Sequence, residues 1–222
     1  MKFILINVFT LALVTSTLAA PAQLDPQQLI KQLQQLLPNL FNYTNLQLPN
    51  LNEIAQSVTP GKCPETKSLA EPFKINEFLG TWYEIERTNL IFEKGQRCVQ
   101  ANYKLEQSTG NVIVNNSGIN NQDKSVFNVG TGKPTDKDNV LAVKFFPLSP
   151  AAQYWVVDTD YTNYALIVSC NDILGLFNIN DAWILSRQST LPADTIDKLK
   201  NELQSLGLSQ LPSRFMTTQQ NC

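Results

Sequence analysis

The side chains that most often perform catalysis are largely missing from this chain. The sequence contains no histidine, so the commonest general base is absent. No serine or cysteine lies in a recognisable nucleophile motif. Asp158 and Asp160 could form a carboxylate pair, and they are the one candidate for acid–base chemistry. We predict that the chain is not an enzyme.

A glycine-x-tryptophan motif and a late arginine suggest a different kind of site. Gly80 and Trp82 open a long series of strand-like segments, and Arg187 ends it. The pattern predicts a closed β-barrel in which Arg187 stacks on the Trp82 indole at the closed end, a structural contact worth about 0.5–2 kcal/mol. Gly80 gives the chain the freedom to turn into the first strand. Period two places Glu84 inside with Trp82, where burial raises the pKa of a carboxyl group unless it meets a donor, and we expect it to hydrogen-bond a ligand or a water.

The elements that position these residues follow from the hydrophobic period. Apolar and polar residues alternate in eight short segments separated by turn residues, which is typical of an all-β barrel or sandwich. The segments begin at Thr81 and continue over residues 99–105, 112–116, 125–130, 140–146, 153–159, 164–170 and 181–187. One amphipathic helix follows, with Thr190 as its expected N-cap and Gly207 at its end, and it should pack outside the barrel.

The four cysteines indicate two disulfide bonds. Residues 1–20 have a lysine, an apolar run and a small-residue cleavage site, which together predict a secretory signal peptide. An even number of cysteines in a secreted chain favours disulfides, and four cysteines allow three pairings. A zinc site is not expected, because no two cysteines are close in sequence and histidine is absent. We predict a secreted, extracellular protein with no metal site and no transmembrane segment.

Residues 21–62 form an extension that differs from the rest of the chain. It is rich in Gln, Asn, Pro and Leu. The composition allows two interpretations, a mobile tail or an amphipathic helix that docks on a partner or a lipid surface. Asn42 and Asn115 begin glycosylation sequons. The net charge is −2 and there is no basic cluster, which argues against nucleic acid as a partner.

The motifs in residues 63–222 resemble those of the lipocalins. The resemblance rests on LGTWYEIER at 79–87, FEKGQRCVQANYKL at 92–105, YWVVDTDYTNYALIVSC at 154–170 and AWILSR at 182–187. It implies an eight-stranded antiparallel up-and-down barrel with one C-terminal helix outside, and a small hydrophobic molecule inside. It also implies the disulfide pairs Cys63–Cys170 and Cys98–Cys222.

The resemblance further implies which residues contact the ligand. The ligand-contacting aromatics of a family member fall on Tyr103, Phe145 and Trp183, and a pocket asparagine falls on Asn116. Tyr103 and Trp183 each carry a polar hydrogen that could orient a ligand oxygen. The alternative is that these aromatics are ordinary core. The stretch Thr159, Asp160 and Tyr161 matches a family turn motif at a strand end, which assigns the two aspartates a structural role.

We therefore expect a secreted carrier of a fatty acid, a sterol or steroid, a retinoid or a tetrapyrrole pigment, with no cofactor beyond that lipid or pigment ligand. A lipoprotein particle or a cell-surface receptor is a further candidate partner. Residues 146–150 depart from the family pattern at the expected open rim, which leaves ligand selectivity open. The alternative function is a secreted structural or interaction protein with a filled barrel, docking through its extension.

Overall fold

The computed structural model describes residues 58–90, 93–145, 151–173 and 175–222. The signal segment, most of the extension, the sequon at Asn42 and the expected rim segment 146–150 lie outside these residues. The contacts divide the chain into two compact units, residues 1–62 with 172–179, and residues 63–171 with 180–222. Each unit is described by itself.

The described part of the first unit is a short strand pair. β1 (Val58–Pro60) runs antiparallel to the first residues of β9 (Phe177–Ser186), with Val58 opposite Ile179. The Asn178 amide donates hydrogen bonds to the carbonyl oxygens of Gly61 (2.9 Å) and Lys62 (3.0 Å). The sequence did not predict this strand. The signal was weak, because two β-branched residues before a proline are too few to show a period.

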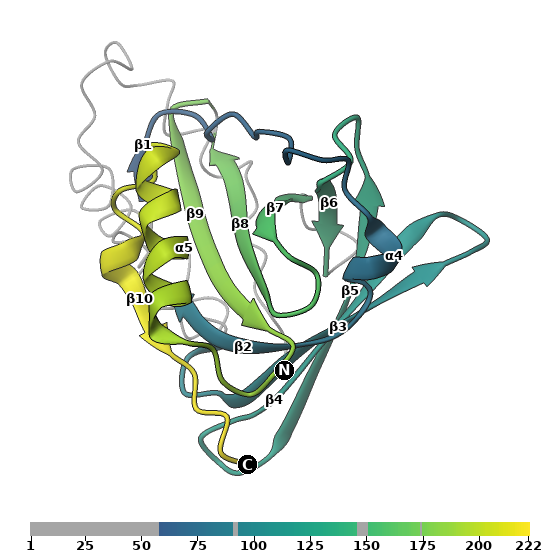
Figure 1. Cartoon of the computed structure of the whole chain (residues 1–222), viewed down its shortest axis with the longest axis vertical. Helices are drawn as coiled ribbons and strands as arrows, with labels where there is room; N and C mark the ends of the chain where they lie inside the picture. The colour runs from purple at the N-terminus through teal and green to yellow at the C-terminus, as the bar shows by residue number, and fades with distance from the viewer. Residues whose placement is uncertain (1–57, 91–92, 146–150, 174) are drawn as a thin grey trace, which may run out of the picture. The chain divides into compact units, whose positions relative to one another are not determined.

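The second unit holds the barrel. Each strand pairs antiparallel with the next, and β9 pairs back with β2, which closes the sheet (Figure 1). The strands are β2 (Gly80–Thr88), β3 (Arg97–Glu106), β4 (Asn111–Ile119), β5 (Ser125–Pro134), β6 (Val140–Lys144), β7 (Ala152–Thr159), β8 (Tyr164–Ile173) and β9. The predicted eight-stranded antiparallel barrel is therefore confirmed.

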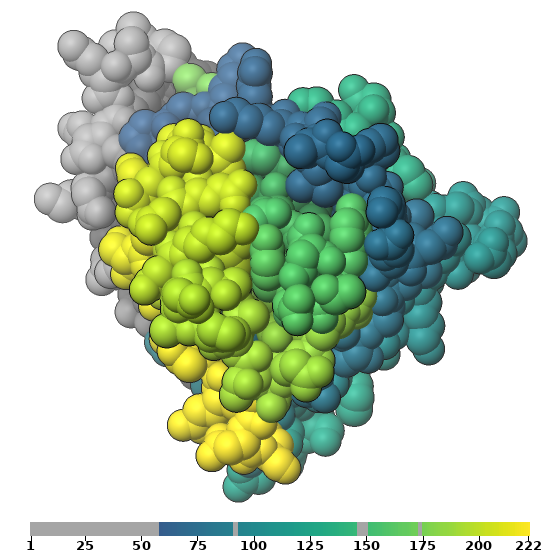
Figure 2. Space-filling view, in the orientation of Figure 1, coloured from purple at the N-terminus to yellow at the C-terminus, as the bar shows by residue number. Residues whose placement is uncertain are grey.

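The helices of this unit lie outside the barrel wall. A short helix, α4 (Ile75–Phe78), precedes β2, and α5 (Ala193–Ser205) lies along β9. A 3-10 turn, η4 (Pro212–Arg214), leads into β10 (Phe215–Thr217), which pairs with β2. In Figure 2, α5 and the chain after it form the yellow-green to yellow part of this face. Among the described residues, no helix is long and apolar enough to cross a bilayer.

The sequence predicted the C-terminal end of α5 correctly but not its N-terminal cap. Gly207 has φ +78° and ends the helix as predicted, with the amide of Leu208 donating to the carbonyl of Leu203 at 3.0 Å. The N-cap is Pro192 and has no side-chain cap, so the expectation for Thr190 was wrong. The Thr190 carbonyl instead accepts a hydrogen bond from the Ser186 hydroxyl at 3.1 Å.

Two apolar clusters lie on opposite sides of the barrel wall. Alternate residues of one strand belong to different clusters: Trp155 packs under α5, and Val156 faces the interior. Leu199 and Leu203 of α5 are completely buried against the outer cluster. Burying each contributes about 1.5–3 kcal/mol, which holds the helix on the wall. The inner cluster contains the candidate site.

Candidate functional site

The closed end is built around Trp82 and Arg187. Trp82 is completely buried, and the guanidinium carbon of Arg187 lies 3.7 Å from its ring centroid. The guanidinium donates hydrogen bonds to the carbonyl oxygens of Thr81 (2.8 Å), Glu77 (2.9 Å) and Leu79 (3.0 Å). Burial lowers the pKa of Arg187. These contacts join the end of α4 to β2 and β9, so the pair acts as a clamp between α4 and the barrel.

The backbone conformation beside this clamp requires glycine at position 80. Its φ is +95°, a left-handed conformation that side-chain-bearing residues rarely adopt. A Cβ there would lie 3.5 Å from the Arg187 guanidinium, so backbone conformation and not space decides the residue.

The turn between β7 and β8 is held by its own side chains. Thr159 donates to the carbonyl of Tyr164 at 2.7 Å, and the Asp160 carboxylate accepts from the amides of Asn163 (2.7 Å) and Tyr164 (3.0 Å). Burial raises the pKa of Asp160, but hydrogen bonds from Asn163 and the backbone outweigh it, so the pKa is lowered. Tyr161 has φ +66°, and its carbonyl accepts from Arg187 at 3.0 Å, which ties the turn to the clamp.

Asp158 and Asp160 do not act together. The Asp158 carboxylate lies 3.1 Å from the Lys198 ammonium of α5 and accepts a hydrogen bond from the Tyr164 hydroxyl at 3.1 Å. One aspartate therefore holds the helix and the other holds the turn.

An aromatic layer lines the interior above the clamp. Tyr103 of β3 packs on Phe78 with ring centroids 5.1 Å apart, and on Tyr154 of β7 at 6.3 Å. Tyr154 in turn lies 6.3 Å from Trp183 of β9. The structure thus brings Tyr103 and Trp183 together in the inner cluster, with Tyr154 between them. Sequence reasoning missed Tyr154, although its position in the alternation of β7, opposite Leu141, carried the signal.

Phe145 joins the same cluster immediately after β6. Its ring lies over Gly130 of β5, where an added Cβ would be 2.8 Å from the ring and 2.9 Å from the Lys144 carbonyl. Glycine at this position makes the room that the phenylalanine ring occupies.

Asn116 and Asn115 point to opposite sides of the wall. Ala101 lies opposite both Trp82 and Asn116 in the strand register, so these three side chains share the inner face. The Asn116 side-chain oxygen is buried and accepts no hydrogen bond from the described residues. Asn115 is on the outer face and exposed.

A β-bulge in β2 brings a cation inside. The register of β2 against β9 shifts between Glu84 and Glu86, so that Arg87 lies opposite Trp183 and on its face. The Arg87 Nε lies 3.4 Å from a Glu84 carboxylate oxygen and 3.1 Å from one of Glu93. All three members of this buried triad are at most 6 % exposed. From the sequence, strict alternation placed only Glu84 of this triad inside the barrel. Alternation does not reveal the bulge that turns Arg87 inward, and it does not apply to Glu93, which lies outside the strands.

Burial raises the pKa of both acids of the triad. For Glu84 the Arg87 charge and a hydrogen bond from Thr218 oppose this rise, and for Glu93 the neighbouring Glu84 charge adds to it. The pKa of Glu93 is therefore raised further. A hydrogen bond from Trp183 lowers it only in part, and that bond uses the indole hydrogen we expected to orient a ligand. The described partners of the Glu84 carboxyl group are Arg87, Thr218 and Glu93, so a ligand contact for it stays a prediction.

The C-terminal segment completes the wall beside the triad. β2 pairs with β3 through Gly80–Tyr83 and with β10 through Glu86–Thr88. Where β2 and β3 no longer pair, the Gln220 side-chain amide lies between them and donates to the carbonyl oxygens of Glu84 in β2 and Val99 in β3, each at 2.8 Å. Thr218 hydrogen-bonds the Glu84 carboxylate from the same segment.

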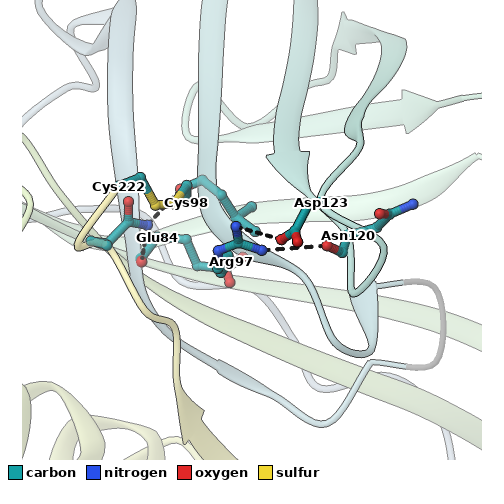
Figure 3. The surroundings of a disulfide bond; sticks show 8 residues. Glu84, Arg97, Cys98, Asn120, Asp123 and Cys222 are labelled. Atoms are coloured by element: carbon teal, nitrogen blue, oxygen red, sulfur yellow. Dashed lines mark hydrogen bonds and ion pairs between the residues drawn. A yellow bond between two sulfur atoms is a disulfide. The ribbon is translucent and has the colours of Figure 1, made fainter.

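Two disulfides hold the chain ends of this unit. Cys98 is bonded to Cys222, which fixes the C-terminal segment to β3, and Cys63 is bonded to Cys170. Figure 3 shows the first bond with Glu84 and Arg97 nearby. Arg97 pairs with Asp123 at 2.8 Å and donates to the Asn120 carbonyl at 3.4 Å, so its charge is engaged at the β4–β5 turn.

A hollow of about 510 Å³ lies outside the barrel, between residues 67–70 and α5. Its lining includes Trp155 and Val157, which belong to the outer cluster, and the charged Lys198 and Glu202. It is therefore separate from the aromatic layer.

Comparisons with known proteins agree with this architecture. The model of the lipocalin / cytosolic fatty-acid binding protein family matches residues 79–217. Apolipoprotein D of Bos taurus is 43 % identical over 166 residues, which cover 73 % of this chain and 85 % of that protein. The Lazarillo protein of Schistocerca americana is 32 % identical over 172 residues, covering 71 % and 77 %. The structure of lobster apocrustacyanin A1 superposes with a TM-score of 0.63 at 24 % identity, covering 79 % of this chain and 94 % of that one, which supports the fold.

Proposed function

The chain belongs to the lipocalin / cytosolic fatty-acid binding protein family, and we propose that it is a secreted carrier of a small hydrophobic ligand held inside the barrel. The resemblance in its motifs, to apolipoprotein D in particular, is confirmed. The family consists of binding proteins, so the chain is a carrier and not an enzyme. The class of ligand, the residues that bind it and the secretion of the protein are proposals.

One observation carries the proposal. Trp183, Tyr154 and Phe145 belong to the inner cluster of a closed barrel, yet each is only half-buried. In the outer cluster, Trp155 is 1 % exposed under α5. Large aromatics that face inward but keep accessible surface are expected where a barrel leaves room for a ligand.

Burial of apolar area is the driving force for such binding. At about 25 cal/mol per Å², a ligand that loses about 300 Å² of apolar surface to the aromatic layer gains about 7.5 kcal/mol before the entropy of association is subtracted. A fatty acid, a sterol or steroid, a retinoid and a tetrapyrrole pigment all have this much apolar surface. Tyr103, Phe145, Trp183 and Asn116 are the proposed contacts.

Secretion is proposed from residues 1–20 and is supported by the two disulfides of the barrel unit. A lipoprotein particle is a candidate partner, supported by the name of the apolipoprotein D relatives. The receptor and the docking role of the extension stay predictions from the sequence.

Extraction of the protein from its native secretion tests the function. We expect organic solvent to release an apolar compound in near-stoichiometric amount, visible by mass spectrometry and, for a pigment, by absorbance. The amino-terminal sequence of the same sample should begin near Pro21. A secreted protein that yields no compound and binds no apolar probe would refute the carrier function.

A further inference from the structure

The interior contains a pair of tyrosine hydroxyls that the aromatic layer presents together. Tyr103 of β3 and Tyr154 of β7 share a hydrogen bond between their hydroxyl groups. One hydroxyl donates within the pair, so the other keeps a hydrogen with no described acceptor. Burial, above all, raises the pKa of both groups. The pair therefore stays uncharged at physiological pH and offers one O–H donor together with oxygen lone pairs.

The cations near this pair are already engaged. Arg87 faces two carboxylates at 3.4 and 3.1 Å and also donates to the Glu93 carbonyl at 2.6 Å. Arg187 stacks on Trp82 and donates to carbonyl oxygens at the closed end. Both guanidinium groups are therefore already directed at acceptors of the protein itself.

Two nearby carboxyl groups also disfavour an anion at the hydroxyls. The charges of Glu93 and Glu84 both raise the pKa of Tyr103, and each effect is larger than the opposing effect of Arg187. Glu93 acts on Tyr154 in the same sense. A carboxylate moved from water to this place would lose its hydration without gaining a counter-charge, whereas an alcohol or a carbonyl needs one hydrogen bond.

We propose that the lumen selects uncharged apolar molecules bearing a hydroxyl or carbonyl oxygen over carboxylates, and that Tyr154 is a ligand-binding residue that meets this oxygen through the Tyr103–Tyr154 pair. The inference rests on the proposed function and narrows it. It removes ionised fatty acids from the four ligand classes, and leaves sterols, retinols and other neutral molecules.

A matched pair of ligands tests the selectivity. Oleyl alcohol and oleate differ only in the head group, and each is used at pH 8 to displace the uncharged fluorescent probe N-phenyl-1-naphthylamine from the full secreted protein. We expect oleyl alcohol to bind at least tenfold more tightly than oleate. Tyr154→Phe, which keeps the ring, should weaken the binding of the alcohol about five- to tenfold more than it weakens the binding of the probe. Tyr83→Phe on the outer side of β2 is the control and should change neither.

Glu93→Gln is an independent test, because it removes a carboxylate and keeps the shape. We expect it to raise the affinity for oleate and so reduce the alcohol-to-acid ratio. The inference would be overturned if the wild type bound oleate as tightly as oleyl alcohol or more tightly. It would also be overturned if Tyr154→Phe kept the wild-type ratio of alcohol affinity to oleate affinity. A wild-type protein that does not bind the probe would instead refute the carrier function, which keeps the two failures distinct.

Discussion

Two tryptophans on opposite sides of the barrel wall allow ligand binding to be separated from folding. Trp183 is half-buried in the inner cluster, and Trp155 is 1 % exposed in the outer cluster, where its indole donates to the Lys67 carbonyl at 3.0 Å. Replacing each with alanine removes the same side chain from two different environments. The change at Trp183 should act on the ligand, and the change at Trp155 on stability.

The magnitudes depend on burial. Trp155→Ala should cost about 3–5 kcal/mol of stability, because it opens a large cavity and removes one of the two described donors to the Lys67 carbonyl. Trp183→Ala should cost about 1–2 kcal/mol, since the side chain is only half-buried and its main loss is the hydrogen bond to Glu93. If a ligand covers about 80 Å² of the indole, its loss weakens binding by about 2 kcal/mol, or about 30-fold.

Probe titration and thermal melting measure the two effects on the same samples. We expect Trp155→Ala to lower the melting temperature by about 6–20 °C with little change in affinity. Trp183→Ala should weaken probe binding strongly and lower the melting temperature less than Trp155→Ala does. If Trp183→Ala lowers stability as much as Trp155→Ala and leaves affinity intact, the inner aromatics are filled core and the pocket assignment is wrong.

Three further predictions concern charge, space and the outer face. Burial raises the pKa of Asp181 to about 6 despite the nearby Arg214 guanidinium, so the folded protein binds this proton more tightly than the unfolded chain does. The associated stability is fully present below about pH 4 and is lost as the pH rises through 6, by about 1–3 kcal/mol. Urea unfolding between pH 4 and 7.5 should show a smaller loss for Asp181→Asn than for the wild type; an equal loss would contradict the assignment. Gly130→Ala places a methyl group 2.8 Å from the Phe145 ring, so urea unfolding should show about 1–3 kcal/mol of destabilisation, and an unchanged midpoint would show that the ring is free to move. Secreted protein should carry a glycan at Asn115, found by peptide mapping, and Asn115→Gln should self-associate in size-exclusion chromatography, because Phe127 on the same outer face of the β4–β5 pair is 72 % exposed. A monomeric variant would show that the glycan does not cover this face.

The regular part of the fold was predictable from the sequence, and the polar part of the interior was not. Alternation from Thr81 to Arg187 predicts eight strands, because each strand separates two unlike faces. A bulge at Ile85 reverses this alternation within β2, so the inward position of Arg87 follows only from the observed pairing with β9. Glu93 reaches the same place from outside any strand, which no periodicity can reveal.

The candidate site shows the same division. Tyr103, Phe145 and Trp183 were assigned from a resemblance, and the alternation agrees with the inner cluster in which they lie. Tyr154 fits the same alternation but was not singled out, because its partner Tyr103 lies 51 positions earlier in the chain. The role of Gln220 depends on where β2 and β3 separate, which is a property of the three-dimensional register.

A crystal structure of the protein purified from its native secretion is the most direct test of the carrier account. We expect electron density for a bound molecule inside the barrel, in contact with Trp183 and Phe145 and with an oxygen near the Tyr154 hydroxyl. An interior filled by the protein's own side chains, with no space for an acyl chain or a ring system, would contradict it.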